Sequence, residues 1–260
     1  MKELIKKFNL KNLTKKQMVL TIVVAVLLII AVIAGRELYF FMTESSFFSN
    51  EKYTVKGIDV SKHQLEVDWE GVAEQGFDFA YIKATQGTNY VDPYFKKNWE
   101  GARKYIFRVG AYHFLSYDTD GETQADTYIR TVPKKSDSLP PVVDVEFYGK
   151  YRKSGQHPSK DTMYEKLDVV LKRLEERYGK RPVIYTNKYV YNTYISGKYT
   201  NYDIWISDQS MSDYLDDGST WAFCQYTFKG KSQYIGDGKK YFDADVFRGT
   251  KYQLRHYNGK

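Results

Sequence analysis

The chain has 260 residues, of which 42% are hydrophobic, and its formal net charge at neutral pH is +7. Residues 1–16 hold six lysines and one glutamate, a local balance of +5, which leaves only +2 for the remaining 244 residues. These lysines adjoin an apolar segment and have few aromatic neighbours, so we expect no nucleic-acid partner. Cys224 is the only cysteine, which excludes an intrachain disulfide.

An uncharged run of 19 residues between Lys16 and Arg36 predicts a transmembrane helix over 18–35. As a helix this run would be roughly 28 Å long, close to the hydrocarbon thickness of a bilayer. The lysines before it predict a cytoplasmic basic tail over 1–17, with the rest of the chain extracellular. A cleaved signal peptide is the alternative, but the run exceeds a signal core and Ile33 does not suit a small-x-small cleavage site. The pattern fits a single-pass protein of the cell membrane in a Gram-positive bacterium, where disulfides are rare.

The rest of the chain reads as a short connection followed by one domain. A stalk is expected over 36–52, because that segment has no clean periodicity. Expected strands are 56–60, 79–84, 108–114, 142–147, 183–186, 203–206, 222–226 and 243–247, and expected helices are 69–75, 94–105, 121–131 and 162–178. This order predicts an α/β fold, a modified and irregular TIM-like β/α barrel over 53–250, followed by a C-terminal tail over 251–260.

The most informative motif is Asp144-Val145-Glu146, which closes the apolar run that begins at Leu139. Alternate residues of a strand share a face, so the two carboxyl groups project together, roughly 6 to 7 Å apart at Cβ. Ionised carboxylates are costly in a buried sheet, so the pair needs a functional reason, a salt-bridged strand end being the structural alternative. Glycoside hydrolysis supplies one, because it needs two carboxyl groups in different protonation states around one acetal.

Two further aspartates are expected beside this pair. Active sites of β/α barrels lie at the C-terminal ends of the strands. Asp59 is near the end of the first expected strand, and Asp243 is on the last one. We therefore expect Asp59, Asp144 and Glu146 at one mouth of the barrel, joined by Asp243.

Five short motifs, in this order, resemble those of the glycoside hydrolase family 25 lysozymes. They are residues 57–61 (GIDVS), 81–87 (YIKATQG), 110–114 (GAYHF), 124–126 (QAD) and 141–146 (PVVDVE). Members of that family are N-acetylmuramidases that cut peptidoglycan between N-acetylmuramic acid and N-acetylglucosamine on a modified β/α barrel. The resemblance covers nearly all of residues 53–248 and implies the same fold and activity here.

The resemblance also implies roles for the four acids. Glu146 corresponds to the general acid and Asp144 to its partner, which steadies an oxazolinium ion when the substrate's own N-acetyl group acts as nucleophile. Two carboxylates on one strand face agree with such neighbouring-group help, because they are too constrained to flank opposite sides of a sugar ring. Asp59 and Asp243 match the remaining catalytic-site aspartates. Their negative charge is expected to raise the pKa of Glu146.

Aromatic and polar side chains near the strand ends are expected to bind the glycan, because sugar rings stack on aromatic faces. The candidates are Tyr81, Gln86, Tyr112, His113, Tyr185, Trp205 and Tyr226. Ordinary packing is the alternative for each aromatic residue, and a structural histidine is the alternative for His113. Gln86 stands where the family usually has glutamate, and Cys224, expected to be a buried structural thiol, stands where it usually has tryptophan. These departures bear on substrate detail and rate more than on reaction class.

Two other classes of function compete with a membrane-anchored muramidase. A weakly active or inactive wall-binding domain would position partners at the membrane, but it would not need four costly carboxyl groups. Mg²⁺ or Ca²⁺ held by these carboxylates would serve another hydrolysis. A transition-metal site is disfavoured, because no histidine has an obvious ligand spacing. We therefore expect no metal and no cofactor. The expected partner is peptidoglycan, and the expected setting is wall remodelling or a transfer apparatus.

Overall fold

The computed structural model describes residues 14–47, 52–153 and 155–259. The chain forms two compact units, which divide between residues 49 and 50. Most of the predicted basic tail (residues 1–13) and part of the predicted stalk (residues 48–51) lie outside the described residues.

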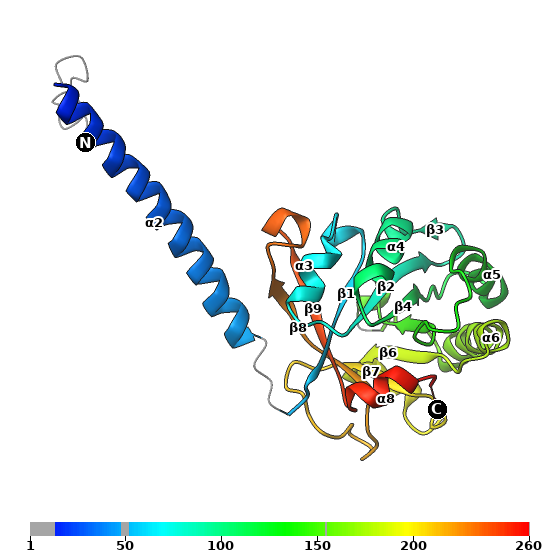
Figure 1. Ribbon diagram of the computed structural model, residues 1–260. Coiled ribbons are helices and arrows are strands. Elements are labelled where there is room, and N and C mark those ends of the chain that lie inside the picture. The colour runs from blue at the N-terminus through cyan, green and yellow to red at the C-terminus, as the bar shows by residue number, and fades with distance from the viewer. Residues whose placement is uncertain (1–13, 48–51, 154, 260) are drawn as a thin grey trace. The chain divides into compact units, whose positions relative to one another are not determined.

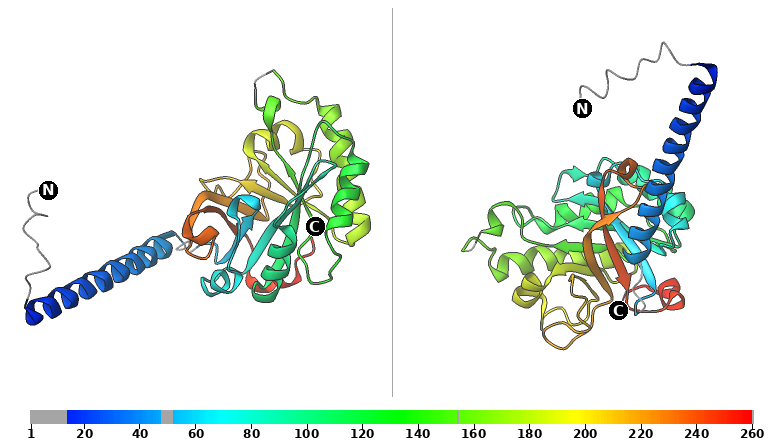
Figure 2. Two further views of the ribbon diagram at one scale, coloured as in Figure 1. Left: turned by 90° about the horizontal axis from the view of Figure 1, so that it is seen from above. Right: turned by 90° about the vertical axis from the view of Figure 1, so that its left-hand side faces the viewer.

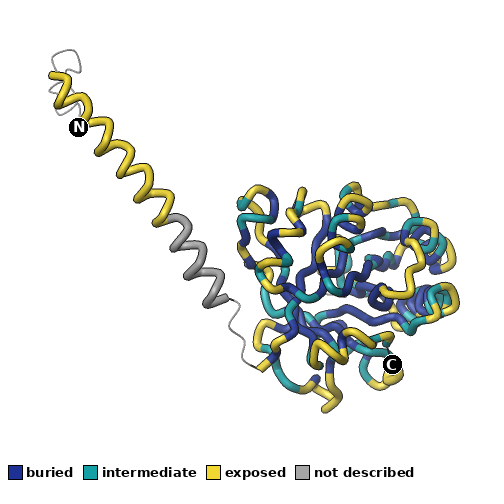
Figure 3. Tube along the Cα trace, viewed as in Figure 1, coloured by how far each residue is buried: buried dark blue, intermediate teal, exposed yellow. Residues whose placement is uncertain are grey.

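Helix α2 (Lys15–Phe47) belongs to the first unit. Its start is capped reciprocally, because the backbone N–H of Gln17 donates to Thr14 Oγ1 at 3.3 Å and that of Thr14 donates to Gln17 Oε1 at 3.0 Å. The stretch Lys15–Gly35 is long and apolar enough to cross a membrane, and its side chains are exposed (Figure 3). The helix continues past residue 35 to Phe47, so this part of the predicted stalk is helical.

The second unit is a closed barrel of eight strands, which confirms the predicted fold class (Figure 1). The barrel strands are β1 (Val55–Val60), β2 (Phe79–Gln86), β4 (Arg108–Phe114), β5 (Val142–Val145), β6 (Val183–Asn187), β7 (Ile204–Ser207), β8 (Phe223–Lys231) and β9 (Tyr241–Phe247). A short strand, β3 (Tyr90–Val91), pairs with the end of β2. Neighbouring strands of the eight-stranded barrel are parallel except at β9, which runs antiparallel to both β8 and β1 and thereby makes the barrel irregular.

Helices cover the outside of the strands, as Figure 2 shows from two further directions. They are α3 (Trp69–Glu74), α4 (Phe95–Tyr105), α5 (Gly121–Thr131), α6 (Lys160–Tyr178), the short α7 (Lys188–Val190) with a π turn η4 (Tyr191–Ile195), and α8 (Lys251–His256), with 3₁₀ turns η2 (Lys62–Gln64), η3 (Gly149–Arg152) and η5 (Gly236–Gly238). Local capping explains the helix limits: Ser159 Oγ accepts from the Thr162 N–H at 3.1 Å to begin α6, and Gly179 ends it in a left-handed conformation. After η4 no long helix intervenes between the described strands, and none was expected from the sequence beyond residue 178.

The predicted C-terminal tail is largely a helix that packs on the barrel. Leu254 of α8 is fully buried in the core, and Tyr257 packs against it. The Arg108 guanidinium donates to the carbonyl of Leu254 at 2.7 Å and to that of Tyr257 at 3.0 Å, from about 146 residues away in the sequence. Sequence periodicity missed this element, because a six-residue helix is too short to show a stripe.

The barrel interior is filled by aromatic rings, among them Tyr81 stacked on Trp205 with ring centroids 4.9 Å apart. Gly110 lies opposite Tyr81 in the parallel register, and the tyrosine ring occupies the space that a side chain there would need. A Cβ added at Gly110 would lie 2.2 Å from Tyr81 Cε1 and 3.0 Å from Leu139 Cβ. Close approach, not turn geometry, therefore requires glycine at this position.

We expect Gly110→Ala to lower the free energy of unfolding of the barrel by about 2–3 kcal/mol, because overpacking forces the Tyr81 ring out of place. Chemical denaturation of the full-length chain in detergent measures this change. Gly35→Ala in α2 is the matched control, since no heavy atom lies within 4 Å of its added Cβ. Equal stability of Gly110→Ala and the parent protein would mean that the ring relaxes freely.

Candidate active site

Four carboxyl groups meet in a cavity of about 160 Å³ at one end of the barrel. Asp59 lies near the end of β1, Asp144 lies on β5, and Glu146 directly follows β5. Asp243 comes from the beginning of β9. Because β9 is antiparallel to β1, its beginning lies beside the end of β1, and Asp243 is the direct register partner of Asp59. The strand geometry thus brings together all four acids singled out in the sequence.

Six more side chains complete the lining of this cavity: Lys83, Tyr112, Phe114, Tyr185, Trp205 and Gln225. Three of them were expected, whereas Lys83, Phe114 and Gln225 were missed. Phe114 follows from strand alternation, since it shares a face with Tyr112 two residues before it. Lys83 likewise lies two residues beyond Tyr81 and reaches the cavity, because it is nearer the carboxyl end of β2.

Glu146 sits in a pocket that favours its protonated form. Burial raises the pKa of Glu146, whereas Arg152, a hydrogen bond from Asn187 and Lys83 act in the opposite direction. The amide of Asn187 is oriented by its role as a helix cap, because its Oδ1 accepts from the Val190 N–H at 3.0 Å. Its Nδ2 is then the group that faces Glu146. Desolvation, not the charge of Asp59 and Asp243, is therefore the main cause of the raised pKa, which corrects the expectation from sequence.

Asp144 is only 6% exposed, and its Oδ1 has no hydrogen-bond partner among the described residues. Burial raises the pKa of Asp144 well above its usual range, and the neighbouring Glu146 carboxyl adds to this effect. The Lys83 ammonium opposes it. The Asp144 carboxyl group lines the cavity and can contact a substrate group there, whereas a carboxyl kept only for structure would usually have hydrogen-bond partners for both oxygens.

Asp59 is held by a short chain of hydrogen bonds. Gln225 Nε2 donates to Asp59 Oδ2 at 2.6 Å, and Gln225 Oε1 accepts from the Tyr185 hydroxyl at 2.7 Å. Burial raises the pKa of Asp59 well above its usual range, the Asp243 charge adds to the rise, and the Gln225 bond opposes it. Gln225 therefore connects an acid of the site to an aromatic wall residue.

Asp243 gives a prediction for stability against pH. Burial, with a smaller contribution from Glu146, raises the pKa of Asp243 to about 6. A raised carboxyl pKa means that ionisation costs folding free energy, so this cost is absent below about pH 4 and complete above about pH 6. We expect Asp243→Asn to increase the free energy of unfolding by about 1–3 kcal/mol at pH 7 and to leave it unchanged at pH 4. Denaturation at both pH values measures the difference, and equal effects at the two would contradict the assignment.

A second cavity of about 550 Å³ adjoins the first, and Lys83 lines both. The Lys83 ammonium donates to Gln86 Oε1 at 2.9 Å, and Gln86 lines the second cavity together with Tyr90 and Tyr148. The amide of Gln86 thus bonds the lysine without neutralising it. Gln86 belongs to this adjoining groove and not to the cavity that holds the acids.

Two predicted glycan contacts are wrong in position, because their side chains are buried elsewhere. Tyr81 is 0% exposed and supports Trp205 from behind, with its hydroxyl donating to the Pro140 carbonyl at 3.4 Å. His113 is also 0% exposed and lies between Thr85 and Gln124, with contacts of 2.7 and 3.1 Å to its ring nitrogens. Strand alternation turns His113 away from the barrel mouth, toward α5.

Tyr226 does not line the cavity of the four acids either. It is partly buried on β8, next to Gln225, where a bulge between residues 225 and 227 interrupts the pairing with β9. The bulge breaks the simple alternation from which a sequence pattern assigns faces.

No group of three or more His, Cys, Asp or Glu side chains placed to hold a metal ion occurs in the described part of the chain.

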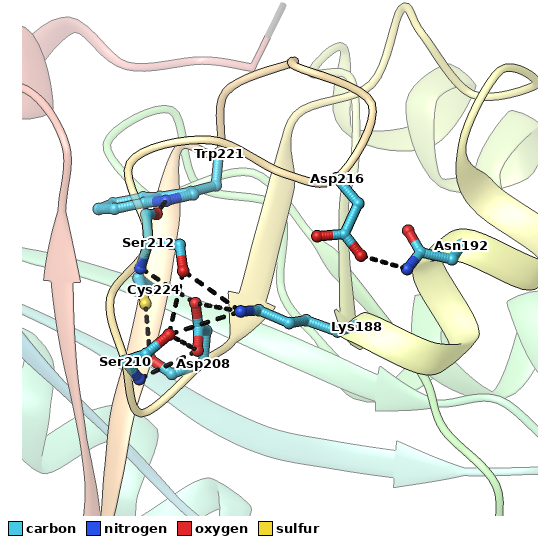
Figure 4. A network of polar contacts seen from close by, with 8 residues as sticks. All are labelled: Lys188, Asn192, Asp208, Ser210, Ser212, Asp216, Trp221 and Cys224. Atoms are coloured by element: carbon cyan, nitrogen blue, oxygen red, sulfur yellow. Dashed lines mark hydrogen bonds and ion pairs between the residues drawn. The ribbon is translucent and has the colours of Figure 1, made fainter.

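Cys224 is a buried thiol within the structural network drawn in Figure 4. Its Sγ donates to the Asp208 carbonyl at 3.4 Å, and the Asp208 carboxylate pairs with Lys188 at 3.0 Å. Burial acts to raise the pKa of Asp208, but the Ser210 hydroxyl and Lys188 lower it overall. Burial also raises the pKa of the Cys224 thiol. This network connects the segment after β7 to the start of α7, so Cys224 has a structural role.

Residues 58–235 match the model of the family described as glycosyl hydrolases family 25. A family 25 glycosyl hydrolase structure from Bacillus anthracis superposes with a TM-score of 0.75 and 41% identity, covering 80% of this chain and 95% of that one. The bacterial lysozyme of Streptomyces coelicolor gives a TM-score of 0.69 and 30% identity, covering 80% and 98%. Lysozyme M1 of Streptomyces globisporus is 31% identical over 212 residues, or 77% of this chain and 70% of that protein. The chain therefore belongs to glycosyl hydrolase family 25 and is a glycosidase of the lysozyme type whose substrate is peptidoglycan.

Proposed function

We propose that this protein cleaves the β-1,4 bond between N-acetylmuramic acid and N-acetylglucosamine with retention of configuration. The observation that carries the proposal is the meeting of Asp144 and Glu146 in one cavity, together with Asp59 and Asp243. Asp144 and Glu146 come from one strand end and are separated by a single residue. A pair so constrained favours participation of the substrate's own N-acetyl group over attack by a second carboxylate across the ring.

In the first step Glu146 acts as general acid. Its proton passes to the glycosidic oxygen as the bond from that oxygen to C1 breaks, and the N-acetyl carbonyl oxygen forms a bond to C1. This step yields an oxazolinium ion and leaves Glu146 as a carboxylate. The raised pKa of Glu146 supports the role, because a buried carboxyl keeps its proton nearer to neutral pH.

In the second step Glu146 accepts a proton from water as the water oxygen attacks C1 and the bond from C1 to the acetamido oxygen breaks. Two inversions at C1 give net retention. Asp144 faces the positive charge of the oxazolinium ion, and because its carboxyl group lines the cavity it can accept from the ring N–H. The Lys83 ammonium and the positive charge that develops on the substrate both favour the anionic form of Asp144 during this step.

Tyr112, Tyr185 and Trp205 are the proposed glycan contacts, because their side chains line the cavity. Gln86 is a proposed contact in the adjoining groove, where an amide can bond sugar hydroxyls without ionising. No cofactor enters the proposed reaction. Neither Gln86 nor Cys224 displaces one of the four acids, so neither departure favours an inactive wall-binding domain.

We further propose that α2 anchors the protein as a single-pass span, with residues 1–17 cytoplasmic and the catalytic unit extracellular. The length and apolar composition of Lys15–Gly35 and the six lysines in residues 1–16 support this topology. An anchored muramidase reaches glycan only near the membrane. This confinement suits remodelling of the cell's own wall in a Gram-positive bacterium. Such remodelling includes opening the wall locally so that a transfer apparatus can cross it.

Digestion of purified peptidoglycan by the full-length protein in detergent tests the reaction. We expect mass spectrometry of the soluble products to show muropeptides with N-acetylmuramic acid at the reducing end. Products with N-acetylglucosamine at the reducing end would assign the other glycosidic bond, and the absence of soluble products from folded protein would contradict the proposal.

A further inference from the structure

Asp245 is a fifth acid near the site that the proposed mechanism does not use. It lies two residues after Asp243 on β9 and is 0% exposed. Trp205 Nε1 donates to Asp245 Oδ1 at 2.9 Å, which joins Asp245 to a wall of the cavity. The other oxygen, Oδ2, meets no N–H or O–H donor among the described residues. An oxygen so deeply buried requires an explanation.

The neighbouring carboxyl group of Asp59 explains why Asp245 Oδ2 has no N–H or O–H donor. The Asp59 and Asp245 side chains lie within hydrogen-bonding distance of each other. Asp59 already receives Gln225 Nε2 on its Oδ2, just as Asp245 receives Trp205 Nε1 on its Oδ1. Each carboxyl group therefore receives one protein donor on one of its two oxygens.

Two buried carboxylates cannot remain in contact while both are ionised, because repulsion adds to the cost of desolvation. Among the described residues, the titratable groups that interact with Asp245 in the electrostatics of the site include no cation to offset two charges. Those groups are Asp59 on β1, Tyr81 on β2, Cys224 and Tyr226 on β8, and Asp243 on β9. A proton between the two carboxyl groups satisfies the free oxygen and removes the repulsion.

We propose that Asp245 is a neutral carboxylic acid whose O–H donates to Asp59, so that Asp59 is held in place as the single anion of the pair. Asp245 is then a positioning residue, since it acts on the reaction only through Asp59. Burial raises the pKa of Asp245 well above its usual range, and its contact with Asp59 raises it further. The same contact lowers the pKa of Asp59. Asp245 is the more deeply buried of the two, at 0% exposed against 6% for Asp59, so its charged form costs more and the proton is assigned to Asp245.

The chemistry of asparagine makes this assignment testable. In Asp245→Asn the amide oxygen still accepts from Trp205 Nε1, and the amide N–H₂ still donates to Asp59, so the substitution imitates the protonated acid. In Asp245→Ala the donor to Asp59 is lost. Because that donor lowers the pKa of Asp59, its loss moves the ionisation of Asp59 to higher pH. Under this proposal the reaction requires Asp59 as an anion, so the acid limb of the activity profile moves to higher pH as well.

Peptidoglycan turnover by the full-length protein in detergent, measured across pH, distinguishes the two variants. For Asp245→Ala we expect kcat to fall about tenfold, with the acid limb shifted upward by about one pH unit. Asp245→Asn is expected to recover most of the lost activity and the original acid limb. Asp161→Asn, at the exposed start of α6, is the control for a general loss of acidic charge. An Asp245→Asn variant no better than Asp245→Ala would overturn the proposal, because it would mean that Asp245 works as an anion.

The activity readout rests on the proposed muramidase function, so a second measurement is independent of it. Infrared spectroscopy of the full-length protein at pH 7 is expected to show the C=O stretch of a protonated carboxyl group, reduced in Asp245→Asn. Identical carboxyl bands in both proteins would overturn the protonated state even if peptidoglycan is cleaved. A band difference without cleavage would support the protonated state and reject the proposed function instead.

Discussion

Replacing Glu146 with glutamine is expected to lower kcat on peptidoglycan by about 10²- to 10⁴-fold, the range typical of a lost general acid. Glutamine has nearly the same size as glutamic acid and retains the contact with Asn187, but it holds no proton for the glycosidic oxygen. Binding of the glycan should change little, so KM is expected to stay within about threefold of its original value. Release of reducing ends from purified peptidoglycan by the full-length protein measures both constants.

The matched control is Glu165→Gln on α6, whose side chain is 73% exposed and makes only a surface ion pair with Lys166. Its kcat should equal that of the parent protein, because exposed pairs contribute little to stability and this one lies outside the cavity. A Glu146→Gln variant that remains folded and keeps its kcat would exclude Glu146 as the general acid. A loss confined to KM would assign it to binding instead.

Much of the fold could be predicted, because its elements alternate with clear and different periodicities. The eight barrel strands were all expected, with limits that differ by a few residues, and so were helices α3, α4, α5 and α6. The reversal of β9 was not expected. Sequence pattern shows which residues share a face of a strand, but it does not show the direction in which that strand runs.

The acids could be anticipated because the carboxyl ends of parallel strands converge. The sequence could not show how far from the barrel mouth a residue lies along its strand. Tyr81 was therefore assigned to the groove although it lies behind Trp205. Partners distant in sequence were equally hidden. Gln225 is 166 residues from Asp59, and its amide has no feature in the sequence that marks it as a ligand of a buried acid.

Asp243 and Asp245 show a finer limit of the sequence. Both lie on one face of β9, so alternation alone gives either of them equal access to the site. The register separates them: Asp243 pairs with Asp59 at the mouth, whereas Asp245 pairs with Gly57 one level deeper. The absence of a side chain at Gly57 leaves room there for the aromatic ring of Phe79. Asp243 therefore lines the cavity and Asp245 does not, although the sequence presents the two acids as equivalent.

Among the described residues that line the cavity, Lys83 is the only cation, and it stands against four acids. Lys83 and Arg152, which acts on Glu146 from outside the lining, cannot together offset four buried charges, so some of the carboxyl groups keep a proton at neutral pH. The raised pKa values of Asp59, Asp144, Glu146 and Asp243 all express this imbalance. The site therefore keeps a proton available for Glu146 without a dedicated proton donor beside it.

Replacing Asp144 with asparagine is expected to have opposite effects on activity and stability. Activity should fall by about 10²- to 10³-fold, because an amide cannot balance the positive charge of the oxazolinium ion. Stability should rise at pH 7. Burial raises the pKa of Asp144, so its ionisation costs folding free energy that is absent below about pH 4 and grows as the pH rises. Turnover of peptidoglycan and denaturation of the same full-length protein measure the two effects.

The opposite signs are what separate a catalytic carboxylate from a structural one. Replacing an acid that is kept for stability would lower both activity and stability, because its hydrogen bonds would be lost with its charge. Asp144 has an unpartnered Oδ1, so asparagine removes an unfavourable charge and few favourable contacts. The control is Asp137→Asn. The Asp137 side chain is 68% exposed and pairs with Arg103, and its replacement should leave both activity and stability nearly unchanged. Loss of stability together with activity in Asp144→Asn would assign Asp144 to the framework of the barrel and leave Glu146 to act with the substrate alone.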